Sequence, residues 1–172
     1  NRRDYLNEGH GERVANLAKE LGEIVGLNDL QLKNLILLGK FHDVGKVGIA
    51  NEIIIKQGMM TPEEEHEMKR HAEIGYRIAQ NIPELIPIAD FILKHHEWWN
   101  GEGYPIGLQG LNIPIENRIL RIVDAYDELT SERSYHEAMT EEDALAELQK
   151  MSGIQFDAAL VEAFTKVLRG KT

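Results

Sequence analysis

Residues 35–46 read LILLGKFHDVGK, an apolar helical segment that ends in a histidine and an aspartate. Leu35 and Leu38 lie three residues apart and His42 follows four later, so all three share one face of a helix. The stretch therefore predicts a buried helix with a polar pair at its end. Adjacent residues point about 100° apart on a helix, so the side chains of His42 and Asp43 face different directions.

Helical periodicity continues along most of the chain, and it predicts an all-α, compact helical bundle in one domain of residues 1–172. Residues 114–129 are apolar on more than one side, which indicates a buried central helix. Residues 44–58 are predicted as a loop or a mixture of short pieces and residues 99–113 as a Gly-rich connection, and a strand at 53–55 is rejected because it has no partner. Helices are expected over residues 14–25, 29–42, 61–78, 85–98 and 114–129, from Thr140 onward and from Asp157 onward.

Five histidines stand where a helical core should be. His10 lies four residues before Val14, in the apolar stripe of its helix, and His42 extends the apolar stripe of Leu35 and Leu38. A single such histidine is usually a core residue satisfied by a hydrogen bond. Five of them favour one shared metal centre, which satisfies them together. The five are His10, His42, His71, His95 and His96, whereas His66 and His136 are assigned to solvated faces.

Composition limits what this centre and its ligands can be. The chain has no cysteine, so a metal must be held by histidine and carboxylate ligands, and a reducing cytoplasm is the expected location. Nitrogen and oxygen donors accept iron, manganese, nickel or zinc. The net charge of −10 argues against long nucleic acid as a partner. No apolar run is long enough to cross a bilayer, so no membrane contact is expected.

Three stretches resemble one family. His42 to Lys46 resembles the HDxGK motif of HD-domain phosphohydrolases, and His95-His96-Glu97 followed by Gly101 to Pro105 resembles the HHE and GxGYP stretch of the HD-GYP subgroup. Residues 118–135 are similar to that subgroup's RI…DxxD…LTSxRxY region. The resemblance covers about residues 10–164. It implies a helical bundle of the HD-domain type, a di-iron or di-manganese centre, and hydrolysis of cyclic di-GMP.

The resemblance also implies roles for particular residues. One ion would take His10, His42, Asp43 and Asp124, and the other would take Asp43 as a bridge with His71, His95 and His96. Lys46 matches a phosphate-contacting lysine and Arg133 an arginine that grips the nucleotide, while Tyr104 lies in a loop that could contact substrate or a partner. Asp127 is expected to support a ligand or to act as an N-cap-like partner rather than to be a ligand itself.

Two ions bridged by Asp43 would lower the pKa of a shared water and generate hydroxide, with Lys46 stabilising charge on the phosphate oxygens. Some family members hold a third ion with a glutamate one turn before the first histidine, and here that position is Leu6. We therefore expect two ions and the linear product pGpG, with slow or no further cleavage to GMP. Ser134 and His136 also depart from the family pattern and could weaken the grip on substrate.

Several alternatives stay open at this point. The domain could hydrolyse another nucleotide, or it could be a catalytically weak sensor or docking module; a purely structural bundle fits the five histidines poorly. The chain starts at Asn1 and is expected to come from a longer multidomain regulatory protein. Tethered sensor or GGDEF-type domains and a homodimer are further candidates among its partners.

Overall fold

The computed structural model describes residues 9–54, 59–132 and 137–170. Within these ranges every regular element is a helix, and the only strand-like pairing is an isolated bridge between Ser152 and Phe156, so the all-α expectation is confirmed. No described helix is long and apolar enough to span a bilayer. The elements are α2 (His10–Ile24), α3 (Asp29–Phe41), η1 (Val44–Gly48), α4 (Asn51–Ile54), α5 (Pro62–Lys69), α6 (His71–Gln80), η2 (Pro83–Ile88), α7 (Ala89–Lys94), η3 (Gly110–Asn112), α8 (Ile115–Thr130), α9 (Glu141–Lys150) and α10 (Ala158–Arg169).

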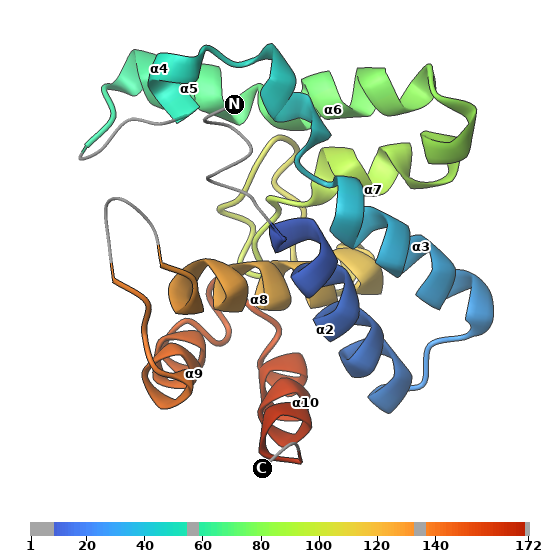
Figure 1. Ribbon diagram of the computed structural model, residues 1–172, viewed down its shortest axis with the longest axis vertical. Helices are drawn as coiled ribbons and strands as arrows, with labels where there is room; N and C mark the ends of the chain where they lie inside the picture. The colour runs from blue at the N-terminus through green and yellow to red at the C-terminus, as the bar shows by residue number, and fades with distance from the viewer. Residues whose placement is uncertain (1–8, 55–58, 133–136, 171–172) are drawn as a thin grey trace.

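Helix α8 runs through the middle of the molecule, with the α2–α3 hairpin on one side and α9 and α10 below it (Figure 1). Helices α6 and α7 pack together above α8. The central place of α8 follows from its sequence, because four apolar residues on different sides of the helix are almost completely buried. These residues are Ile119, Leu120, Ile122 and Val123.

The predicted helix starts are confirmed by their capping hydrogen bonds. The side chain of Asn28 accepts from the Gln31 amide, and that of Thr61 accepts from the Glu64 amide, each as part of a reciprocal capping box. Thr140 caps α9 by accepting from the Asp143 amide, and Asp157 caps α10 by accepting from the Ala159 amide. These caps are local in sequence, which is why the sequence predicts them well.

Two predicted helices are each divided in the structure, so their expected extents are wrong. The helix expected over 61–78 breaks at Arg70 into α5 and α6, where Arg70 bonds back to Glu67 in a tighter turn. The imidazole of His71 donates to the carbonyl oxygen of Met68 at 2.6 Å beside this break.

The helix expected over 85–98 is the 3-10 helix η2 followed by the short helix α7. Pro87 lies inside η2 and has no amide hydrogen for an α-helical bond, which explains the tighter start. Helix α7 ends at Lys94, so His95 is its C-cap. Residues 44–54 contain the two short helices η1 and α4, which agrees with the predicted mixture of short pieces, and residues 55–58 lie outside the described ranges.

Candidate metal centre

The structure brings the seven predicted ligands together in two clusters that share Asp43. The first cluster is His10, His42, Asp43 and Asp124, and the second cluster is Asp43, His71, His95 and His96. Within each cluster one donor atom per residue lies within 4.8 Å of the others. This is the same division that the resemblance implied, and it places donors for two cations on either side of one carboxylate.

Most of the donor residues of the two clusters lie at the ends of helices. His10 is the first residue of α2, His71 is the first residue of α6, and His42 and His95 follow the last residues of α3 and α7. Asp124 lies within α8 and faces the point where these ends meet. The packing of α2, α3, α6, α7 and α8 therefore sets the positions of the donors.

In the second cluster the imidazole nitrogens face one another. The Nδ1 atoms of His71 and His95 donate to the carbonyl oxygens of Met68 and Ile92, both at 2.6 Å. A carbonyl oxygen can only accept a hydrogen bond, so Nδ1 carries the proton in each neutral ring and Nε2 presents a lone pair. The two Nε2 atoms lie 3.1 Å apart. The Nε2 of His96 lies 2.9 Å from that of His71. A cation between these nitrogens would remove the repulsion of their lone pairs.

Burial keeps the second cluster ready for a cation. It lowers the pKa of His95 to about 3, with the neighbouring His71 adding to the effect, and it also lowers the pKa values of His71 and His96. The three imidazoles are therefore neutral at neutral pH. Asp43 supplies the only carboxylate of this cluster, with Oδ1 3.8 Å from His71 Nε2 and 3.7 Å from His95 Nε2.

In the first cluster imidazole nitrogens face carboxylate oxygens. His42 Nδ1 donates to the Gly39 carbonyl at 2.9 Å, and its Nε2 lies 3.1 Å from Asp124 Oδ1 and 3.2 Å from Asp43 Oδ2. Burial alone would lower the pKa of His42, but the two carboxylates outweigh it and raise that pKa. The first cluster therefore binds positive charge favourably, either a proton or a metal ion.

His10 shows the same need for a cation. Its buried Nε2 has no hydrogen-bond partner among the described residues, although Asp124 Oδ1 is only 2.8 Å away. Burial would lower the pKa of His10, but the adjacent carboxylates of Asp124 and Asp127 outweigh this and raise it to about 9. Facing lone pairs in one cluster and an unpartnered nitrogen beside carboxylates in the other both fit divalent cations.

Asp127 supports His10 from behind, as expected from the sequence. Its Oδ2 accepts from His10 Nδ1 at 2.6 Å, and its Oδ1 accepts from Arg13 Nε at 2.7 Å. This fixes the ring with Nε2 pointing into the cluster. Sequence reasoning missed Arg13, although its place three residues after His10 puts it on the same helix face.

Lys46 lies beside the shared carboxylate, with Nζ 3.3 Å from Asp43 Oδ2. Burial would lower its pKa, but Asp43 and Glu128 outweigh this and raise it, so the ammonium stays charged. Helix α3 does not continue to Lys46, because it ends at Phe41 and η1 follows. The lysine nevertheless reaches the clusters through η1.

The loop after α7, residues 97–108, packs against the second cluster. The ring of Tyr104 stacks on that of His96 with centroids 4.9 Å apart, and burial raises the pKa of Tyr104 to about 12. The buried carboxylate of Glu97 accepts from the amides of Ile106 at 3.3 Å and Leu108 at 2.6 Å. A Cβ on Gly103 would lie 2.3 Å from the Trp98 amide nitrogen, so the close fold of this loop requires glycine.

Other expectations have different outcomes. His66 is exposed, as expected. Leu6, Arg133, Ser134 and His136 lie outside the described residues, so the roles assigned to them stay predictions.

Sequence reasoning also missed Arg121, which comes from α8 and places Nη1 3.4 Å from His96 Nδ1. A signal was available, because Arg121 lies three residues before Asp124 and therefore on a neighbouring helix face.

Comparisons with known proteins identify the family of the chain. The family model described as HD domain matches residues 2–160. A cyclic di-GMP phosphodiesterase of Thermotoga maritima is 38% identical over 167 residues, which cover 96% of this chain and 45% of that protein. A 3'3'-cGAMP-specific phosphodiesterase 2 of Vibrio cholerae is 37% identical over 155 residues, which cover 89% of this chain and 30% of that protein.

The chain thus spans less than half the length of these two relatives. The crystal structure of a cyclic GMP-AMP specific phosphodiesterase of V. cholerae superposes with a TM-score of 0.74 at 22% identity, covering 93% of this chain and 44% of that one. This likeness confirms the fold. The match of the family model over nearly the whole chain, together with the histidine and aspartate clusters, shows that the chain belongs to the HD domain family and carries the motifs of its HD-GYP subgroup.

Proposed function

We propose that this domain is a phosphodiesterase that opens cyclic di-GMP to linear pGpG at a centre of two divalent cations. The observation that carries the proposal is the sharing of Asp43 by two clusters of donors, with the Lys46 ammonium beside it. The names of the relatives support a cyclic dinucleotide as the substrate.

The seven donors would hold the cations, three histidines and Asp43 on one side, and two histidines, Asp124 and Asp43 on the other. When bound, such a pair acidifies water and polarises a phosphoryl oxygen. Nitrogen and oxygen donors in this number suit iron or manganese, and nickel or zinc would also be accepted.

The chain's own residues would then position the substrate. Lys46 carries a positive charge next to Asp43, where it can donate to an equatorial phosphate oxygen as charge develops there. Tyr104 stacks on His96 and stays protonated, so its hydroxyl would be available as a donor to the substrate. Arg133 is assigned to the nucleotide on the resemblance alone.

The test is an anaerobic assay with Fe(II) or Mn(II), in which cyclic di-GMP, pGpG and GMP are separated by chromatography. We expect pGpG to accumulate, and 3'3'-cGAMP, run in parallel, measures the breadth of substrate. Asp43→Asn should abolish turnover and lower the metal content, whereas Asp90→Asn, at an exposed position on α7, should change neither. Failure of every loaded form to cleave a cyclic dinucleotide would refute the proposal.

A further inference from the structure

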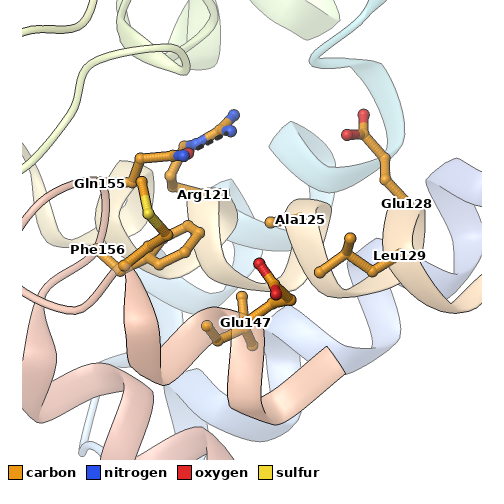
Figure 2. A pocket seen from close by; sticks show the side chains of 9 residues that line it. Arg121, Ala125, Glu128, Leu129, Glu147, Gln155 and Phe156 are labelled. Atoms are coloured by element: carbon orange, nitrogen blue, oxygen red, sulfur yellow. Dashed lines mark hydrogen bonds between the residues drawn. The ribbon is translucent and has the colours of Figure 1, made fainter. Parts of the chain in front are cut away.

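A cavity of about 290 Å³ opens between α8 and α9, next to the metal-ligand clusters. Figure 2 shows Arg121 and Glu128 rising from α8 on either side of Ala125, with Gln155 and Phe156 at one end. Leu148 and Met151 contribute apolar lining. The cavity therefore combines an apolar wall with one cation, Arg121, and two carboxylates, Glu128 on α8 and Glu147 on α9.

The spacing of these residues on α8 opens a gap between the two charges. Arg121, Ala125 and Glu128 are four and three residues apart, so they share one face of the helix. Arg121 and Glu128 are separated by about 10.5 Å along the axis, at 1.5 Å per residue. Between them Ala125 offers only a methyl group, so a flat ligand could lie there with one charge at each end.

The two charged groups on α8, Arg121 and Glu128, keep unused hydrogen-bonding capacity. Arg121 Nη2 donates to Gln155 Oε1 at 3.0 Å, but its buried Nε has no partner among the described residues. The carboxylate of Glu128 is partly buried and makes no hydrogen bond or ion pair within the described part of the chain. Buried polar groups are normally paired, so this arrangement favours a ligand with acceptors at one edge and donors at the other.

We propose that this cavity is a subsite for a guanine base of the substrate, with Arg121 on the O6 and N7 edge and Glu128 on the N1 and N2 edge. Guanine presents two acceptors, N7 and O6, that arginine binds in a bidentate manner, and its N2 amino group is a donor on the opposite side. The N1–H beside that amino group is a second donor, so one carboxylate can accept from both.

Adenine does not fit the same pair. It carries an amino donor where guanine has O6, so one arginine donor would face another donor. It also lacks the N1 and N2 donors, which would leave Glu128 unpaired. A site built to hydrogen-bond a ligand rejects an analogue without the matching groups much more strongly than an apolar pocket does.

The cavity also lies where a substrate base would be needed. Arg121 contacts both the cavity and His96 of the second cluster, and Glu128 is close enough to Lys46 and Asp124 for their charges to influence it. A nucleotide with its base in the cavity would therefore have its phosphate in the neighbourhood of the clusters. This inference rests on the proposed function and adds the base that the site selects.

The test uses Glu128→Gln, which preserves size but replaces a carboxylate by an amide. We expect kcat/KM for cyclic di-GMP to fall about 10- to 100-fold, chiefly through KM, which corresponds to the loss of a hydrogen bond to a charged group. The preference for cyclic di-GMP over cyclic di-AMP should shrink by a similar factor. Glu142→Gln, at an exposed position on α9, is the matched control and should leave both values unchanged.

Two further measurements separate the interpretations. Bis(p-nitrophenyl) phosphate has no base, so an equal loss of its hydrolysis in Glu128→Gln would show that the residue acts through the metal centre and would overturn the subsite. An unchanged preference for guanine would overturn it too.

Binding of GMP and AMP, followed by NMR titration, tests the cavity without turnover. Wild type should prefer GMP, and Glu128→Gln should lose the preference; an equal affinity of wild type for both would refute the subsite. A wild type that cleaves bis(p-nitrophenyl) phosphate but no cyclic dinucleotide would instead refute the proposed function, while the GMP titration still decides on the cavity.

Discussion

Replacing Gly45 with alanine tests how the fold holds the two clusters together. Gly45 lies in η1 where this segment crosses the start of α6, and a Cβ there would meet the carbonyl oxygen of His71 at 1.8 Å and the amide nitrogen of Gly75 at 2.5 Å. Both atoms belong to the backbone, so neither can rotate away. The new methyl group must therefore push η1 and α6 apart.

The size of the displacement follows from these contacts. Real Cβ atoms do not approach other atoms more closely than 3.0 Å, so the 1.8 Å contact must open by about 1.2 Å. Metal–ligand distances tolerate changes of about 0.2 Å. Asp43 precedes Gly45 by two residues, whereas His71 lies on the other side of the crossing. The displacement should therefore move Asp43 and His71 too far apart to bind the same cation.

We expect Gly45→Ala to bind one cation or fewer per chain and to lose at least about 100-fold in kcat, because a misplacement of 1 Å can cost that much. The overpacking should lower the free energy of unfolding by about 1–3 kcal/mol. Elemental analysis, hydrolysis of cyclic di-GMP and thermal unfolding give the three values.

Gly48→Ala is the matched control within η1. Its Cβ would meet only the side chain of Ile74, at 3.0 Å, and that side chain can adjust. Metal content and rate should therefore stay near wild type. If Gly45→Ala also retained two cations and full activity, the crossing of η1 and α6 would not be what places Asp43.

Three further predictions concern single residues. Lys46→Ala should keep the metals and lower kcat about 10²- to 10³-fold, as loss of a donor to developing charge does; loss of metal instead would make the lysine structural. Asp127→Asn should weaken metal binding in the first cluster about 10- to 100-fold and leave the second cluster unaffected, which a metal titration can resolve. Since the pKa of His10 is raised to about 9, a cation must displace its proton at pH 7, and calorimetry in buffers of different ionisation enthalpy should detect the release. Because folding raises this pKa, protonated His10 stabilises the metal-free protein. That stabilisation is complete below pH 6.5 and is lost as the pH rises through about 9.

The sequence by itself predicted the features that depend on neighbouring residues. Asn28 and Thr61 reach amides three residues ahead, so their caps could be placed without knowledge of the fold. The apolar stripes placed His10 and His42 on buried faces for the same reason. The division of the seven ligands came from the resemblance, because spacing alone does not say which helices meet.

The tertiary structure decided what those buried faces contact. Arg13 and Asp127 are 114 residues apart, and Arg121 and His96 are 25 apart, yet each pair lies in contact because α8 packs against α2 and α7. The breaks at Arg70 and before Ala89 were not predicted either, because the apolar periodicity continues across a local change from α to 3-10 geometry. Such contacts are chosen by the packing of whole helices, and no short stretch of sequence contains both partners.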